Sequence, residues 1–425
     1  MCIGRPLLFI NIKTKQSQQN GAPLNKRSFS HMANRDKTID YLRATAMLWV
    51  ILIHVLYWGA FFVSDTINLI KSFLLLEMPL FFFVTGASNS FSKTSGYFSF
   101  VFKRYKRVLI PYWVFALLCA GLSIIDFNRS GTVDFATVCK ILLSWIIPND
   151  KQMTNIPYMT WSLWFIPVYL CVILVIPLLK RMRNSKHSDL FIIVLLFLFV
   201  STCYLNFGRI RSVVFYSFWT YIGLFYNKIT LHLKERNFRK SLVFVALIGI
   251  SGILGLYTAG MPLDMQSNKA PPNLMFFVFS VVNLSLIFLL IPFITKLGKH
   301  IEQHKLPNRI LVLFSTRTMT IFLYQSFAFY ITIRYTNMLI PGIDFISAVI
   351  KSILCLIATV MLCAVFAIIF GKIEDIGSKR PPRTEKEWNN VIKSLKKAKH
   401  AYNDKFADSI VVTSIREDGT HEEIE

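Results

Sequence analysis

Apolar stretches of about 20 residues recur along this 425-residue chain. A helix of about 20 residues crosses the ~30 Å hydrocarbon core of a bilayer, and there only helices or closed barrels pair every backbone polar group. The composition agrees, because 54% of the residues are hydrophobic and only 16% are charged. A soluble domain carries roughly 25% charged residues. The sequence therefore predicts an all-α, polytopic transmembrane helical bundle.

The apolar stretches give the expected number of spans and their direction. Lys and Arg concentrate in alternate loops, 18 against 7, and the basic amino-terminal arm lies on the richer side. The positive-inside rule then predicts about ten spans with both termini in the cytoplasm. We expect the bundle to lie in the inner (plasma) membrane. The expected spans are 43–63, 69–90, 108–125, 161–179, 189–206, 212–229, 241–258, 273–294, 318–336 and 343–370.

Segments outside these spans complete the expected organisation. Residues 1–38 form a basic cytoplasmic arm that we expect to be disordered, residues 39–370 form the transmembrane domain, and residues 371–425 form a cytoplasmic tail. In the tail, 384–400 predicts an amphipathic helix, which either lies against the anionic inner leaflet or is simply solvated. The apolar segment 134–147 is too short to span, so we expect an interfacial or re-entrant helix with Asp134 as its N-terminal cap.

Charge and cysteine content exclude several classes of function. The formal net charge is +24, but the basic residues sit in short loops between apolar spans, which indicates membrane topology rather than nucleic-acid binding. Five of the seven cysteines lie inside apolar spans, so no disulfide framework is expected. No CxxC or HExxH spacing occurs, and we expect no metal site.

The first span carries the clearest candidate site. Asp40 and Arg43 precede it, and His54 follows Arg43 by eleven positions, which returns to the same helical stripe ~16 Å further along the axis. An arginine at the cytoplasmic boundary can hold the phosphates of a cofactor, and a histidine near the midplane can take a proton from an attacking hydroxyl. We expect the two side chains to line one shared cavity. The alternative is a snorkelling anchor and a hydrogen-bonded core histidine.

Two further charged positions belong to this hypothesis. Glu77 lies in the second span at about the depth of His54, so it is a candidate to orient the imidazole or to stabilise the imidazolium. Its alternative is a carboxyl group satisfied by a neighbouring helix. Arg104 and Arg107 lie three residues apart ahead of Pro111, and two guanidinium groups on one face suit a multiply phosphorylated ligand or, equally, a positive-inside anchor.

At these residues the chain resembles the acyltransferase-3 family of membrane proteins. Arg43 and His54 match its Arg-x10-His signature, and further motifs follow in the family's order over roughly 38–370. They are PLFFFVTG at 79–86, the Arg104-x-x-Arg107 pair, Trp161-Ser-Leu-Trp164-Phe165 and Lys269-Ala-Pro-Pro-Asn. Two positions depart from the pattern: Thr85 replaces a usual serine, and Gln325 replaces a histidine found in many members, so we assign Gln325 no acid–base role.

The resemblance implies an O-acyltransferase that moves an acyl group, commonly acetyl, from acyl-coenzyme A to a hydroxyl of a cell-envelope glycan, glycolipid or similar acceptor. It implies that Arg43 contacts the donor, that His54 serves the transfer, and that Arg104 and Arg107 grip the cofactor phosphates. Some members carry a fused periplasmic domain, so a separate periplasmic partner is expected if transfer needs one. The residues that we expect to support the site are Asp40, Thr85, Trp164 and Lys269.

Other functions remain open on the sequence alone. A secondary transporter or a lipid or glycan flippase also has many spans and intramembrane charges, but no pair of Gly/Pro-interrupted spans occupies matching positions in two halves. A non-catalytic receptor or scaffold is a third class. No GxSxG-like nucleophile occurs, which favours direct transfer over a covalent intermediate. The aromatic residues Trp145, Tyr158 and Trp161 either stack on a sugar acceptor or form an interfacial belt.

Overall fold

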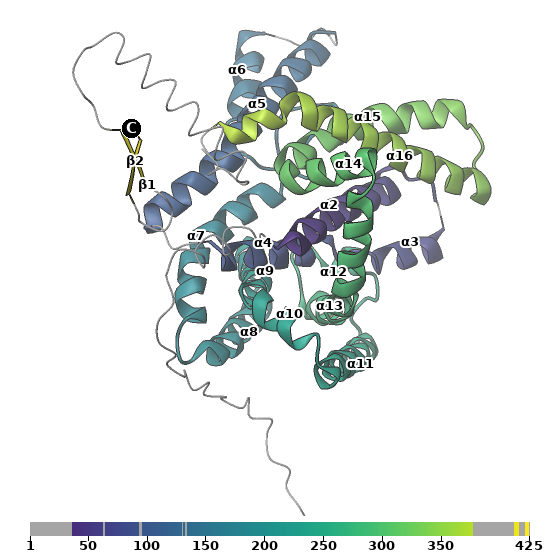
Figure 1. The fold of residues 1–425 in the computed structure, drawn as a ribbon. Coiled ribbons are helices and arrows are strands. Elements are labelled where there is room, and N and C mark those ends of the chain that lie inside the picture. Colours follow the sequence, from purple (N-terminus) through teal and green to yellow (C-terminus); the bar gives the residue numbers. More distant parts are fainter. Residues whose placement is uncertain are drawn as a thin grey trace, which may run out of the picture. The chain divides into compact units, whose positions relative to one another are not determined.

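The computed structural model describes most of the chain, and residues Lys37–Pro381 form one compact unit of helices (Figure 1). In the described part of this unit the only strand-like pairing is an isolated bridge between Lys269 and Pro272. The strands β1 (Val412–Ile415) and β2 (His421–Ile424) belong to the second unit and pair antiparallel. The described residues are 36–62, 64–92, 96–129, 131, 134–376, 412–415 and 421–424.

The helices follow one another along nearly the whole unit. In chain order they are α2 (Lys37–Trp58), α3 (Asp65–Ser72), α4 (Glu77–Ser90), α5 (Tyr97–Arg129), α6 (Phe135–Ser144), α7 (Phe165–Arg183), α8 (Ser188–Tyr204), α9 (Gly208–Leu224), α10 (Tyr226–His232), α11 (Arg236–Thr258), α12 (Met265–Asn268), α13 (Leu274–Glu302), α14 (Lys305–Thr316), α15 (Thr318–Leu339), α16 (Phe345–Phe370) and the 3-10 helix η1 (Gly371–Asp375). A helix lies at each of the ten predicted spans.

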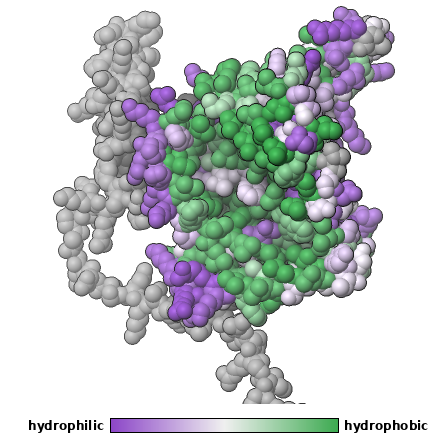
Figure 2. All heavy atoms as spheres, turned by 90° about the vertical axis from the view of Figure 1, so that its right-hand side faces the viewer, coloured by the Kyte–Doolittle hydropathy of each residue, from purple (hydrophilic) through white to green (hydrophobic). Residues whose placement is uncertain are grey.

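Seven of the described helices are long and apolar enough to cross a membrane, with α3 and α4 counted as one. The number is eight if α14 and α15, which meet at 104°, form one broken span. The helix α8 is apolar but shorter. Hydrophobic residues cover most of the face shown in Figure 2, and hydrophilic residues gather at its margins. The chain is therefore a multi-pass membrane protein, while the count of ten and the cytoplasmic termini stay predictions.

Local chemistry explains where several helices begin. Asp134 caps α6 as predicted, because its side chain accepts a hydrogen bond from the backbone N–H of Thr137. The second predicted span is broken between α3 and α4. Pro79 cannot lie inside a continuous helix without a clash with the carbonyl four residues earlier, but it fits the first turn of α4. The basic stretch ahead of Pro111, predicted to be a loop, is part of α5, which begins at Tyr97.

Helices α4 and α9 approach each other closely through two glycines. A Cβ atom on Gly86 would meet the backbone carbonyl of Thr220, and one on Gly223 would meet the carbonyl of Phe83. Small residues allow such contact between membrane helices. This close approach gives a packing reason for Gly86, the glycine that ends the PLFFFVTG motif.

The helix α2 packs against α4, α13, α14, α15 and α16 and so runs through the middle of the bundle (Figure 1). Its two ends define two regions of the unit. We call the end where α2 begins, near Arg43, the arginine end, and the end where α2 finishes, near His54, the histidine end. The predicted tail helix and nearly all of the basic arm lie outside the described residues, so the three-part organisation stays a prediction.

Candidate active site

His54 lies in the last two turns of α2 and is held by a glutamine of α15. Nδ1 of His54 lies 3.1 Å from Oε1 of Gln325. The amide of Gln325 is itself oriented, because its Nε2 donates to the carbonyl of Phe322 at 2.9 Å. An amide oxygen can only accept, so Nδ1 carries the proton and Nε2 of His54 keeps the basic lone pair.

Aromatic rings fix the imidazole from its sides. The ring of His54 stacks on Trp58 with centroids 4.0 Å apart, and Phe329 contacts it edge-on at 5.9 Å. Trp58 in turn packs against Tyr158 and Trp161. The φ angle of Tyr158 is 69°, in the left-handed region that a bulky residue rarely adopts and that is found preferentially at functional sites.

A cavity of about 460 Å³ opens beside this histidine. Its wall includes His54, Trp161, Trp164 and Lys269, which come from α2, the loop before α7 and the loop before α13. Trp161 is half exposed and Lys269 is partly buried. The structure therefore brings together, at the histidine end, three of the sequence-predicted site residues from segments far apart in the chain. We call this space the histidine cavity.

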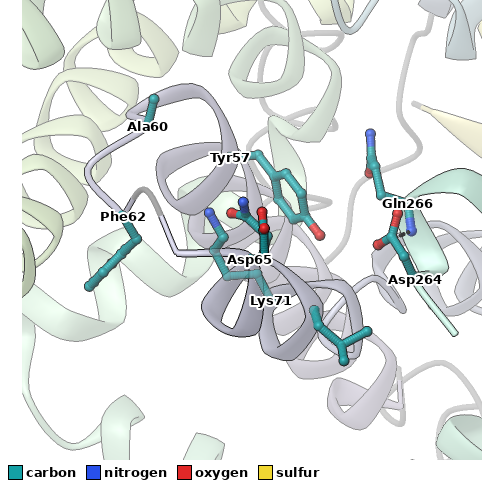
Figure 3. A pocket seen from close by; sticks show the side chains of 9 residues that line it. Tyr57, Ala60, Phe62, Asp65, Lys71, Asp264 and Gln266 are labelled. Carbon is teal, nitrogen blue, oxygen red and sulfur yellow. Dashed lines mark hydrogen bonds between the residues drawn. The ribbon is translucent and has the colours of Figure 1, made fainter.

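A second cavity of about 610 Å³ adjoins the first. Both are lined by Tyr57 and Gln266. Figure 3 shows Tyr57 with Lys71 on one side and Asp264 and Gln266 on the other. The ammonium of Lys71 lies 5.3 Å from the centre of the Tyr57 ring, and that of Lys269 lies 6.0 Å from it.

Glu77 begins α4 and is only 3% exposed. In the structure, Gln325 rather than Glu77 takes the hydrogen bond of His54 Nδ1. The charges of Glu77 and Lys269 act on each other, although their side chains form no ion pair within 4.0 Å in the described part of the chain. One oxygen of Glu77, Oε2, is buried and has no hydrogen-bond partner among the described residues. A role of Glu77 in stabilising charge at the site stays a prediction.

Arg43 joins three helices at the arginine end. Its Nη1 donates to Oδ1 of Asp40 and to the carbonyl of Ser315, each at 3.1 Å, and its Nη2 donates to Oγ of Ser88. Asp40 thus supports Arg43 directly. Arg43 does not line the histidine cavity. The single cavity that the sequence predicts for Arg43 and His54 is therefore not seen in the described residues, because the Arg43 guanidinium is engaged between α2, α4 and α14.

The second predicted basic pair lies at the same end. Nη2 of Arg104 donates to Oδ1 of Asn89 at 3.0 Å, and Asn89 directly follows Ser88, so Arg43 and Arg104 bind neighbouring residues of α4. Asn89 also donates to the carbonyl of Thr85, whose hydroxyl donates to Phe81 of its own helix.

Further charges gather around this pair. The charges of Arg107 and Arg317 both act on Glu374, which is buried and accepts two hydrogen bonds from Thr320. Lys180 of α7 is close enough to Arg104 for their charges to act on each other, and it donates to Ser92, two residues after α4 ends. Cationic groups of α2, α5 and α7, and Arg317 between α14 and α15, thus collect at the arginine end.

The sequence did not identify Gln325 as a functional residue. The sequence feature that could have identified it is its position: in the segment TIFLYQS, Gln325 stands where many members of the resembled family have histidine. The structure gives it the contact with the imidazole. As for metals, no group of three or more His, Cys, Asp or Glu side chains is arranged to hold an ion within the described ranges.

The fold and the site define a multi-pass membrane protein whose helices surround a cavity with a positioned histidine. The chain belongs to the acyltransferase-3 family, whose model, described as an acyltransferase domain, matches residues 36–368. The family resemblance seen in the sequence is thereby confirmed, and the protein is a membrane acyltransferase. No curated protein and no solved structure matches the chain.

Proposed function

We propose that the protein transfers an acyl group, most simply acetyl, from acyl-coenzyme A to a hydroxyl of a cell-envelope glycan, glycolipid or similar acceptor. The observation that carries the proposal is the hydrogen bond between His54 and Gln325 in the wall of the histidine cavity. It fixes the tautomer in which Nε2 is the proton acceptor. A neutral imidazole held in one orientation beside an accessible space is what general-base catalysis of acyl transfer requires.

In the proposed reaction, Nε2 of His54 takes the proton of the acceptor hydroxyl as its oxygen attacks the thioester carbonyl carbon. The new carbon–oxygen bond gives a tetrahedral intermediate. Its collapse breaks the carbon–sulfur bond, and the coenzyme A thiolate takes the proton back from the imidazolium of His54. The products are the acyl ester and the free thiol, and His54 returns to its initial state. No enzyme nucleophile is needed.

The arginine end supports binding of the anionic donor. Coenzyme A carries phosphates, which guanidinium groups bind through charge-assisted hydrogen bonds. Arg43 and Arg104 bind adjacent residues of α4, and Lys180 lies near Arg104. The proposal requires a donor held by these groups at the cytoplasmic side to extend its thioester along α2 to His54, ~16 Å further along the helix axis, and therefore to open a path between Arg43 and the histidine cavity, which Arg43 does not line. Donor and acceptor then approach one site from opposite ends of the bundle.

Mass spectrometry of envelope glycans and lipids tests the proposal. Cells that lack the protein should lose one acyl modification, and wild-type protein should restore it. His54→Ala should not restore it, although the variant should be present in the membrane at the wild-type level. A transporter or flippase would change the location of an unmodified molecule rather than its mass. Envelope molecules of unchanged mass in the absence of the protein would refute the proposal.

A further inference from the structure

We infer that Lys269 stabilises the negative charge that develops on the thioester carbonyl oxygen during transfer, and that Glu77 acts as a positioning residue that keeps Lys269 charged. The inference deepens the proposed function and rests on it. Acyl transfer passes through a tetrahedral intermediate with an oxyanion, and fixed donors at that oxygen commonly contribute most to the rate. His54, positioned by Gln325, accepts and returns the proton only. A different group must therefore stabilise the negative charge of the oxyanion.

Lys269 is in the right place for this role. It lines the histidine cavity together with His54, and its charge acts on His54. Its ammonium lies 6.0 Å from the ring centre of Tyr57, which is three residues along α2 from His54. A carbonyl carbon attacked by a hydroxyl beside His54 therefore places its oxygen within the same cavity as the ammonium.

The loop that carries Lys269 is held firmly. The preceding residue, Asn268, is fully buried, and its amide donates to the carbonyls of Pro262 and Asp264. Its side-chain oxygen accepts from Asn273 at 2.6 Å, and Asn273 in turn caps α13 by accepting from the N–H of Phe276. A charged group on such an anchored loop needs little rearrangement during the reaction, which is what makes electrostatic stabilisation effective.

Glu77 supplies the compensating charge. Burial lowers the pKa of Lys269, and the negative charges of Glu77 and Asp264 oppose that change. Because Glu77 acts from beyond ion-pair distance, the ammonium keeps its protons available to a ligand. Oε2 of Glu77 is buried and has no hydrogen-bond partner among the described residues, so the positive charge of Lys269 is what favours the ionised carboxylate there. The titratable or charged groups that act on Lys269 or line the same cavity are Glu77, Asp264, His54, Tyr57, Asp150 and Arg209.

The step is balanced without any further reactant. As the acceptor oxygen bonds to the carbonyl carbon, the carbonyl π electrons move to oxygen, and the oxyanion accepts a hydrogen bond from the Lys269 ammonium. When the carbon–sulfur bond breaks, the carbonyl re-forms and Lys269 returns unchanged. The proton of the acceptor travels to His54 and then to the thiolate.

Lys269→Met tests the inference in steady-state kinetics with purified protein and acyl-coenzyme A. We expect kcat to fall about 100-fold or more, with the KM for acyl-coenzyme A changed less than about threefold. Lys351→Met is the matched control, because Lys351 is also a buried lysine but lies on α16 and lines neither cavity. It should keep the wild-type kcat. A folded Lys269→Met variant with a kcat near that of the wild type would overturn the inference.

Glu77→Gln decides the question if Lys269→Met does not fold. Without the Glu77 charge, Lys269 loses its proton at lower pH, so the alkaline limb of the kcat profile should move to lower pH. If Glu77 instead oriented the imidazole, kcat would fall at every pH with no such movement, and an unmoved limb would overturn the inference. Wild-type transfer that His54→Ala abolishes establishes the proposed function separately. A negative result at Lys269 or Glu77 then refutes this inference alone.

Discussion

Replacing Gln325 with methionine removes the acceptor that holds Nδ1 of His54 while it nearly keeps the side-chain volume in a fully buried position. In the transition state the imidazole is positively charged, so the lost hydrogen bond is one to a charged group, which is worth about 1.5–3 kcal/mol. At 1.36 kcal/mol for each factor of ten, kcat should fall about 10- to 150-fold. The KM for acyl-coenzyme A should not change, because the proposed binding site of the donor phosphates is at the other end of α2.

The assay is acyl transfer by purified protein in lipid nanodiscs, with initial rates over a range of acyl-coenzyme A concentrations. Thr332→Val is the matched control on the same helix. Thr332 is also buried, and its hydroxyl lies 3.0 Å from that of Thr359, away from the cavity. This variant should lose some thermal stability and keep its kcat.

A double-mutant cycle with His54→Ala gives the refuting result. If Gln325 acts only through the imidazole, Gln325→Met should have no further effect in the His54→Ala background. An equal reduction in both backgrounds would show that Gln325 affects the rate by another route, and the tautomer argument would be wrong.

Three further predictions concern the packing, the basic groups and the absence of a metal-binding cluster among the described residues. Gly86→Ala should lower the free energy of unfolding by about 1–3 kcal/mol, because the added methyl group meets the Thr220 carbonyl. The control Gly121→Ala, whose methyl group lies in open space on α5, should not destabilise the protein. Thermal melting in detergent distinguishes the two variants. Arg43→Ala should raise the KM for acyl-coenzyme A about tenfold or more, while Ser88→Ala, which removes one neighbour of the guanidinium, should leave it within about twofold. EDTA should leave the transfer rate unchanged, and a loss restored by added Zn²⁺ or Mg²⁺ would contradict the proposed mechanism.

Much of the fold was predictable because the bilayer imposes length and polarity on each span. The predicted span 343–370 corresponds to α16 (Phe345–Phe370), and the predicted cap at Asp134 is present. The break between α3 and α4 was not predicted, because the sequence does not show whether Pro79 bends a helix or restarts it.

The candidate site was predictable in part. The sequence identified Arg43 and His54 from their spacing along one helix, and both lie on α2. The spacing within one helix cannot show what other helices bring, and the partner of His54 comes from α15, 271 residues later. For the same reason the sequence linked Glu77 to His54 by depth, whereas in the structure the charge of Glu77 acts on Lys269 without an ion pair.

The packing at Arg43 also limits the sequence argument. A shared helical stripe predicted one cavity for Arg43 and His54, but bonds to Ser88 and Ser315 enclose the guanidinium. Those hydrogen bonds depend on where α4 and α14 end. The pattern of apolar residues along α2 gives no information about those positions. Donor binding at the arginine end therefore requires phosphates to compete with these partners, which charge-assisted bonds to phosphate can do.

The release of coenzyme A thiol by the purified protein, in the presence of envelope lipids or glycans as acceptors, tests the central claim most directly. Wild-type protein should release one thiol for each acyl ester that mass spectrometry detects on the acceptor. His54→Ala should release none above background while it still binds acyl-coenzyme A. Ester formation at the wild-type rate by a folded His54→Ala variant would contradict the account, because no imidazole would then be required for the transfer.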